Sequence, residues 1–279
     1  MAENQTPQDD NFGHKHMDPP KAKHPSKPAN EMIENNPGTH VKKLIAVISG
    51  KGGVGKSSVS ALCALHCMKK GYRTAILDAD ITGPSIPRMF GLGPADVRAD
   101  AQYLYPAQSA TGIKVMSMNL LMEKEEQPVV WRSPVITGAM RQFWTDVVWG
   151  DVDYMFVDMP PGTGDIPLTL YQAFPLDGII IVATPQELVE MIVQKAVNMA
   201  RMMNIPILGL IENMSWLPCP HCGEKIYPFG ESGIDEVAKR ENLPVLAKLP
   251  IDSKLAKACD EGTIEYYEGE DLAGLDAVL

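Results

Sequence analysis

Long apolar runs, cysteine and excess positive charge are all scarce in this chain of 279 residues. No apolar run approaches the roughly 20 residues that span a bilayer, and the start, MAENQTPQDD, is too polar for a signal peptide. The five cysteines favour reduced thiols or metal ligands over structural disulfides. The net charge of −10 disfavours binding to nucleic acid or to anionic lipid. We therefore expect a cytoplasmic protein with no nucleic-acid or membrane partner.

Residues 1–40 contain no apolar periodicity and are rich in Pro, Asn, Lys, Asp and His. Such a segment cannot bury enough surface to offset the entropy of ordering, so we expect a disordered tail. Three of its histidines, His14, His16 and His24, are not expected to bind a metal, because nothing holds them in one geometry. Residues 41–279 are enough for one α/β domain with a substantial core.

From Val41 onward, apolar runs alternate with helical patterns. The runs are nearly continuous in Val, Ile and Leu, which is typical of strands buried on both faces of a parallel sheet. The pattern predicts a doubly wound, mostly parallel α/β fold with ligands at the carboxyl ends of the strands. We expect strands at 44–48, 74–77, 154–157, 178–183, 205–211 and 244–249, and helices at 56–70, 134–148, 186–203, 233–241 and 253–260.

The segment 49–59, SGKGGVGKSSV, lies between an expected strand and an expected helix and matches G-x-x-x-x-G-K-[ST] at every fixed position. Glycines let successive N–H groups point at phosphate oxygens, and the helix start adds its positive end. Lys56 can reach the β and γ phosphates, and the Ser57 hydroxyl can bind Mg²⁺. The complete match disfavours an ordinary glycine-rich turn. The expected contacts to the nucleotide are Gly50, Lys51, Gly52, Gly53, Val54, Gly55, Lys56, Ser57 and Ser58.

Carboxylates follow two further expected strands. Asp78 and Asp80 leave the second strand in LDADITGPSIP, and Asp158 ends an apolar run in the arrangement of a Walker B motif. These groups can position Mg²⁺, its waters or the attacking water, and a capping or turn role is the alternative for Asp78 and Asp80. After Asp158, the segment MPPGTGD contains Gly162, which permits close approach to a γ phosphate and indicates a switch.

A third group of residues can bind the base. Asn213 closes the run ILGLIEN, and Pro250 and Asp252 follow the last expected strand. Carboxyl strand ends of this kind allow an amide and a short loop to contact a base. A helix-capping role for Asn213 is the open alternative.

Cys219 and Cys222 are separated by two residues in a loop rich in Pro and Gly, so both sulfurs can point at one centre. Soft thiolates restrict that centre to Zn²⁺, Cu(I) or an iron–sulfur cluster. The other cysteines, Cys63, Cys67 and Cys259, lie in helical patterns, and we expect the first two to be core residues. One chain therefore supplies two thiolates, and a twofold dimer would supply four. A zinc staple, an inert turn and a redox dithiol remain alternatives.

These motifs together resemble known ATPases. Lys51, a second lysine in the phosphate-binding loop, is similar to that of the deviant Walker A motif of the ParA/MinD and nitrogenase iron-protein class, in which it crosses to the partner's nucleotide. Over about residues 41–271 the chain resembles the Mrp/ApbC family of iron–sulfur P-loop ATPases. The matching motifs are the P-loop, DADITGPSIP, VVWRSP at 129–134, VDMPPGTGD at 157–165 and ENMSWLPCPHCGEKIYPFG.

The resemblance implies a homodimer that holds a bridging [4Fe–4S] cluster on Cys219 and Cys222 of both subunits. It implies that the protein hydrolyses ATP and passes the cluster to apo-proteins, with cluster scaffold proteins as further partners. We expect ATP to move Gly162 and neighbouring loops and so to change how tightly the cluster is held. The implied catalytic residues are Lys51, Lys56, Asp80 and Asp158, with Asp80 positioning water and Asp78 helping near the metal, and the implied adenine contacts are Asn213, Pro250 and Asp252.

The alternative function is a zinc-bridged dimeric ATPase that targets or positions other proteins, similar to arsenite-pump or MinD-like ATPases. Positioning ATPases use a basic amphipathic C-terminal helix or a basic surface, whereas this sequence ends in the acidic EGTIEYYEGEDLAGLDAVL. Targeting ATPases add a Met-rich helical subdomain, and the 16 methionines here are scattered, as in ordinary cores.

Overall fold

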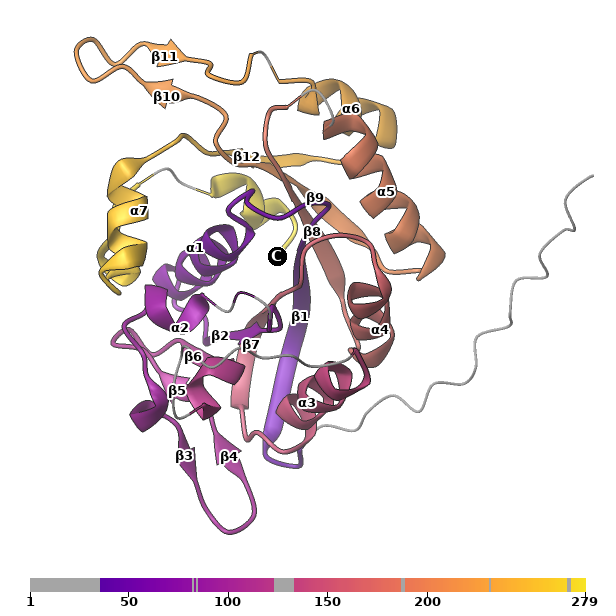
Figure 1. Ribbon diagram of the computed structural model, residues 1–279, viewed down its shortest axis with the longest axis vertical. Coiled ribbons are helices and arrows are strands. Elements are labelled where there is room, and N and C mark those ends of the chain that lie inside the picture. Colours follow the sequence, from indigo (N-terminus) through magenta and orange to yellow (C-terminus); the bar gives the residue numbers. More distant parts are fainter. Residues whose placement is uncertain are drawn as a thin grey trace, which may run out of the picture. The chain divides into compact units, whose positions relative to one another are not determined.

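An eight-stranded sheet forms the centre of the fold (Figure 1). The computed structural model describes residues 36–81, 83, 85–122, 133–186, 189–230, 232–269 and 272–279. The strand order is β12-β9-β8-β1-β7-β2-β6-β5, and neighbouring strands are parallel except for the antiparallel β5–β6 pair. The strands are β1 (Thr39–Ser49), β2 (Thr74–Asp78), β5 (Ala107–Gln108), β6 (Lys114–Ser117), β7 (Gly150–Asp158), β8 (Gly178–Ala183), β9 (Ile207–Glu212) and β12 (Val245–Lys248).

Helices cover both faces of this sheet (Figure 1). Successive residues of β1 point to opposite faces, so Ile45 and Val47 pack with α1 and α2, whereas Ala46 and Ile48 belong to the core beneath α3 to α6. This two-sided burial explains why β1 is apolar from Leu44 to Ile48, the part of the strand that lies in the core. The helices are α1 (Lys56–Lys69), α2 (Ile86–Met89), α3 (Ser133–Thr145), α4 (Asp165–Ala173), α5 (Val189–Met202), α6 (Ile234–Glu241) and α7 (Ser253–Asp260).

Two short hairpins extend the fold. One pairs β3 (Arg98–Ala99) with β4 (Leu104–Tyr105), and the other pairs β10 (Leu217–Pro218) with β11 (Lys225–Ile226). The second hairpin carries both cysteines of the CxxC pair and projects from the body of the molecule (Figure 1). Single turns of 3₁₀ helix lie at Pro94–Asp96, Met118–Leu121, Ile264–Tyr266 and Ala273–Ala277.

The doubly wound, mostly parallel α/β fold predicted from the sequence is confirmed. Every expected strand and helix is present, and the helix at 253–260 has the expected bounds. Besides the strands of the two short hairpins, the prediction missed β5, β6, α2 and α4. The first three have four residues or fewer, too short to show a periodicity, and α4 contains Pro167, which a helix tolerates in its first turn.

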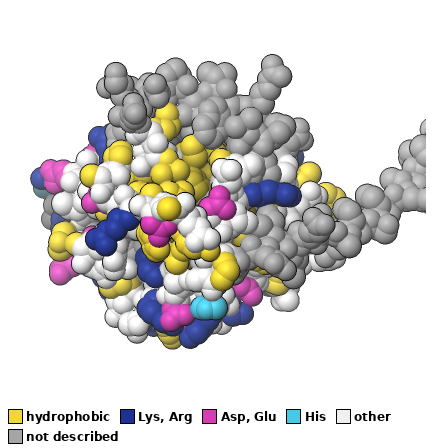
Figure 2. All heavy atoms as spheres, turned by 90° about the horizontal axis from the view of Figure 1, so that it is seen from below, with side chains coloured by type: hydrophobic (Ala, Val, Ile, Leu, Met, Phe, Trp, Pro, Cys, Tyr) yellow, Lys and Arg dark blue, Asp and Glu magenta, His cyan; other side chains and the backbone are white. Residues whose placement is uncertain are grey.

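Some sequence predictions lie outside the described residues. These are the predicted disordered tail, with His14, His16 and His24 but apart from its last five positions, and most of the VVWRSP motif. In the part of the chain that the structure describes, no helix is both long enough and apolar enough to cross a membrane. On the face seen from below, apolar side chains gather in the middle, with acidic and basic side chains interspersed around them (Figure 2).

Candidate nucleotide site and cysteine hairpin

The phosphate-binding loop joins β1 to α1 at the carboxyl edge of the sheet (Figure 1). Gly55 precedes α1 with a φ of 74°, a left-handed conformation that costs other residues about 1–2 kcal/mol. A Cβ at Gly55 would lie 2.2 Å from Nδ2 of Asn213, and one at Gly50 would lie 2.1 Å from Cγ2 of Ile192. The loop therefore needs glycine at these two positions because of backbone conformation and close packing.

Asp158 gathers the polar side chains of the loop around one buried carboxylate. Its Oδ1 lies 2.7 Å from Nζ of Lys56 and accepts a hydrogen bond from Oγ of Ser60 at 2.8 Å. Its Oδ2 accepts one from Oγ of Ser57 at 2.6 Å. Oδ2 of Asp80 lies 3.8 Å from the same Lys56 nitrogen. The predicted lysine, serine and aspartates thus converge, because β1, β7 and β2 are neighbours in the sheet.

Asp78 has a different environment from the other two aspartates. Its Oδ1 accepts the backbone N–H of Asp80 at 3.2 Å, and its Oδ2 accepts the N–H of Ile86 and the hydroxyl of Ser117, both at 3.3 Å. Burial and the nearby charge of Asp158 raise the pKa of Asp78 to about 8. These contacts give Asp78 the turn role that the sequence left open.

A cavity of about 270 Å³ lies over the phosphate-binding loop. Residues 52–58 of the loop line it together with Asp80, Met89 and Pro161. The glycine-rich segment after β7 lies against the loop, because the N–H of Gly162 donates to the carbonyl of Ser49 at 2.8 Å. This arrangement can hold a polyphosphate between backbone N–H groups and the Lys56 ammonium.

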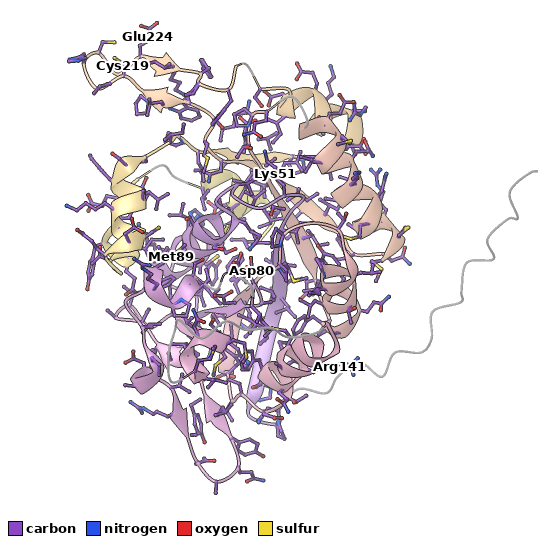
Figure 3. All side chains as sticks on the ribbon, in the orientation of Figure 1. Lys51, Asp80, Met89, Arg141, Cys219 and Glu224 are labelled. Atoms are coloured by element: carbon purple, nitrogen blue, oxygen red, sulfur yellow. The ribbon has the colours of Figure 1, made fainter. Side chains whose placement is uncertain are left out.

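Lys51 lies at the carboxyl edge of the sheet, close to the loop that follows β8 (Figure 3). Its Nζ donates to the side-chain oxygen of Gln186, and its carbonyl accepts the hydroxyl of Ser49 at 2.9 Å. Within the chain, Lys51 is thus turned to a polar partner outside the Asp158 cluster. The sequence did not indicate Gln186, because 135 residues separate it from Lys51.

The predicted base contacts are split between two places. Nδ2 of Asn213 donates to the carbonyl of Val54 at 3.0 Å, so its amide is tied to the phosphate-binding loop. No helix begins at Asn213, and the capping alternative for this residue is wrong. Asp252 is the residue that caps a helix, because its Oδ1 accepts the N–H of Lys254 at 2.7 Å.

A larger cavity, of about 880 Å³, separates the cysteine hairpin from the start of α7. Pro250 and Asp252 line one side of it, and Leu217, Pro218 and Pro220 line another. The predicted base-binding loop and the cysteine loop therefore face the same cavity.

Cys219 and Cys222 lie in the turn between β10 and β11, at the end of the projecting hairpin (Figure 3). The N–H of Cys219 donates to the carbonyl of Glu224 at 2.8 Å, and the N–H of Gly223 donates to the carbonyl of Cys219 at 2.9 Å. Backbone N–H groups of Cys222 and His221 and the side chain of Cys222 lower the pKa of the Cys219 thiol. The turn therefore favours a thiolate, the form that binds metal.

The other three cysteines are held apart from this turn. Cys63 and Cys67 are fully buried in α1, and Cys259 lies in α7. Burial raises the pKa of Cys63 and Cys259, and raises that of Cys67 to about 12. The prediction of a core role for the α1 cysteines is confirmed. Among the described residues, no cluster of three or more His, Cys, Asp or Glu side chains could hold a metal ion, so the hairpin of one chain offers only a pair of thiols.

Residues 40–276 match the family described as ParA: NUBPL iron-transfer P-loop NTPase. The chain belongs to this family. It is accordingly a P-loop NTPase, which hydrolyses a nucleoside triphosphate. It is 46% identical over 239 residues to an iron-sulfur cluster carrier protein of Clostridium perfringens, covering 83% of this chain and 84% of that one. Against the carrier protein of Methanocaldococcus jannaschii, identity is 44% over 223 residues, covering 80% and 77%.

Solved structures agree with the family's fold. The nucleotide-binding protein of Archaeoglobus fulgidus, in complex with ADP, matches with a TM-score of 0.75 and 42% identity, covering 86% of this chain and 93% of that one. MinD of Aquifex aeolicus, in its complex with MinC, matches with a TM-score of 0.57 and 18% identity, covering 79% and 86%. At that identity the second match supports the fold alone.

Proposed function

We propose that this NTPase is a carrier that uses ATP and holds a [4Fe–4S] cluster on Cys219 and Cys222 of two subunits before passing it to apo-proteins. The observation that carries the proposal is the incomplete thiolate site. Two cysteines lie in a thiolate-favouring turn at the end of a projecting hairpin, and no third ligand joins them among the described residues. A cluster is held by four thiolates, and a second copy of the chain supplies the missing two. The cluster carriers related to this chain support the assignment.

The surface of the hairpin supports contact between two copies. Leu217, Ile226, Tyr227 and Phe229 are all large, apolar and between 37% and 50% exposed. Apolar side chains gathered on one small element indicate a surface that a partner covers. In the dimer, Lys51 leaves Gln186 and reaches the partner's nucleotide.

The nucleotide site carries out hydrolysis with residues of the Asp158 cluster. Lys56 exchanges Asp158 for phosphate oxygens, and Asp80 positions the attacking water. The hard oxygens of Ser57 and Asp158 suit Mg²⁺, which would neutralise charge that develops on the transferred phosphate. Asn213, beside the phosphate-binding loop, and Pro250 and Asp252, at the larger cavity, are the proposed contacts to the adenine.

Anaerobic reconstitution with iron and sulfide tests the cluster site. We expect about four iron and four sulfide per dimer, with the broad visible absorption of a cluster. Cys219→Ser and Cys222→Ser should each abolish binding, because two thiolates per subunit leave no spare ligand. Cys259→Ser is the matched control, since Cys259 lies in α7 and not in the hairpin.

Unchanged cluster content in either hairpin variant would overturn the proposal. Preferential binding of zinc, with no cluster absorption, would instead support a zinc-bridged targeting or positioning ATPase. Delivery is tested by mixing the loaded protein with an apo-protein that needs a [4Fe–4S] cluster, and following recovery of the acceptor's activity. A carrier should restore it faster than free iron and sulfide do.

A further inference from the structure

Glu212, the last residue of β9, is completely buried at the base of the cysteine hairpin. Its Oε1 accepts a hydrogen bond from Oγ of Ser215 at 2.7 Å, and its Oε2 accepts one from Oγ of Ser232. Ser215 precedes the hairpin in the chain, and Ser232 follows it. One carboxylate therefore fastens both ends of the segment that carries Cys219 and Cys222.

The next residue in the chain, Asn213, makes the contact with the phosphate-binding loop. Its amide donates to the carbonyl of Val54 at 3.0 Å and packs so closely on Gly55 that a Cβ there would lie 2.2 Å away. Two consecutive residues at the end of β9 thus contact the two functional regions: Glu212 contacts the ends of the cysteine hairpin, and Asn213 contacts the phosphate-binding loop. A shift of the loop around a bound nucleotide would act on Asn213 directly, because of these contacts, and Glu212 is its neighbour in the chain.

The buried carboxylate makes independent movement of the two hairpin ends costly. If Ser215 or Ser232 moved away alone, a buried carboxylate oxygen would lose its hydrogen bond with no water in place to replace it, which is unfavourable. Both ends are also tied to neighbouring elements. The N–H of Ser215 donates to the carbonyl of Leu249 at 2.8 Å, and Oγ of Ser232 accepts the N–H of Ile234 at 3.0 Å. The ends therefore move together with Glu212.

We propose that Glu212, acting through Ser215 and Ser232, is a positioning residue that transmits the nucleotide state of the phosphate-binding loop to the Cys219–Cys222 turn. The proposal rests on the proposed function and assigns the path by which its two halves communicate. Coupling between two ligands is reciprocal, so the nucleotide changes the hold on the cluster by the same factor as the cluster changes nucleotide affinity.

The first test needs no cluster. Alkylation of Cys219 and Cys222 is followed by mass spectrometry in the apo-protein, with and without ATP and Mg²⁺. We expect nucleotide to change the rate about fivefold or more, the lower end of typical coupling. In Glu212→Gln and Ser232→Ala the ratio of the two rates should approach one, while both variants still bind nucleotide.

Glu265→Gln is the matched control. Glu265 is also a buried carboxylate held by hydroxyls, accepting Oγ of Ser109 at 2.6 Å and the hydroxyl of Thr111, but these partners lie in the turn between β5 and β6. Its removal should lower stability as Glu212→Gln does and leave the ratio of alkylation rates at the wild-type value. This control separates a loss of coupling from a general loosening of the fold.

The second test uses the loaded protein. Loss of the cluster to a chelator is timed with and without ATP, and we expect the ratio of rates to fall in Glu212→Gln and Ser232→Ala and to persist in Glu265→Gln. The coupling would be overturned if ATP left the rate of cluster loss unchanged in the wild-type protein. It would also be overturned if ATP changed that rate in both Glu212→Gln and Ser232→Ala as much as in the wild-type protein. Either result would leave the carrier function intact. A wild-type protein that binds no cluster through Cys219 and Cys222 would overturn the carrier function, and the alkylation ratio would then decide the coupling alone.

Discussion

The phosphate-binding loop and the cysteine hairpin differ in burial and in how firmly their functional side chains are held. Asp158 is fully buried and is held by Lys56, Ser57 and Ser60 within one chain. Cys222 is exposed, on a two-stranded hairpin that projects from the body. Hydrolysis needs groups fixed to within a fraction of an ångström, whereas a carrier needs ligands that can release their cargo. In the proposed function, one chain contains a complete nucleotide site and half of a cluster site.

The largest effect on the nucleotide site alone is expected for Lys56→Ala. We expect NTP hydrolysis to fall by about 10²-fold or more, because the variant removes the charge that stabilises the phosphate. Cluster content after reconstitution should stay at the wild-type level, since Lys56 pairs with Asp158 and Asp80, which lie outside the hairpin. Phosphate release and iron content measure the two halves separately. Lys42→Ala, which removes a largely exposed partner of Asp153, is the control and should change neither.

Two glycines with the same backbone conformation, one in each region, differ in how closely they are packed. Gly55 has a φ of 74° and Gly223 a φ of 75°, but only Gly55 has neighbours in the place a Cβ would take. Gly55→Ala should lower the free energy of unfolding by roughly 2–5 kcal/mol, through conformation and overpacking. Gly223→Ala should cost about 1 kcal/mol and act only locally. Urea denaturation measures both, and equal losses would contradict the difference in packing.

Asp78 should make the free energy of unfolding depend on pH. Its raised pKa means that the folded protein binds a proton more tightly than the unfolded chain, so stability falls as pH rises from about 4 to about 8. The slope can reach about 1.4 kcal/mol per pH unit for one proton. Asp78→Asn should flatten the profile in that window. Urea unfolding from pH 5 to 9, with EDTA and without nucleotide, measures the difference.

Asp153 is the opposite case, on the surface. Hydrogen bonds from Arg73 and Lys42 lower its pKa, so whatever stability it contributes is present at neutral pH and is lost on acidification. Asp153→Asn should therefore leave the profile between pH 5 and 9 unchanged. A flattened profile in this variant, or an unchanged one in Asp78→Asn, would contradict the assignment of the slope to Asp78.

The smallest expected effect concerns the hairpin itself. Nζ of Lys225, the first residue of β11, lies 3.7 Å from the centre of the ring of Trp216, which precedes β10; this is a cation–π contact. Lys225→Met keeps the length of the side chain and removes the charge, at a cost of about 0.5–1 kcal/mol. Hydrogen exchange in the hairpin should quicken about two- to fivefold. Amide exchange in β1 should not change. An equal increase in the hairpin and in β1 would show that the contact stabilises the whole fold and not the hairpin alone.

Much of the nucleotide site could be predicted from sequence because its parts lie at strand ends. A glycine-rich loop after one buried strand and an aspartate after another must meet if the strands are neighbours, and the Lys56–Asp158 pair bears this out. The role of Asp78 could not be separated from that of Asp80, because both leave the same strand. Only the fold shows that Asp78 is turned toward Ser117 of β6, a strand too short to be recognised.

The connection between the two regions could not be predicted at all. Asn213 and Val54 are 159 residues apart, and Ser232 is an ordinary loop serine until the chain folds it over Glu212. One sign was present in the sequence, because Glu212 is an acidic residue at the end of an otherwise apolar strand. A charge in such a place needs partners, but their identity depends on how the hairpin returns to the body.

The ion pair between Lys56 and Asp158 makes nucleotide binding an exchange. Both side chains are buried, and each already neutralises the other, so the resting loop contains no isolated lysine charge. In the proposed function, an arriving polyphosphate would displace Asp158 from Lys56, and part of its attraction to Lys56 would offset the broken ion pair. When the product leaves, Asp158 can again neutralise the charge of Lys56, so the lysine is not left unpaired. The loop thereby gives up some affinity and gains an easier release, which suits a protein that must bind, hydrolyse and begin again.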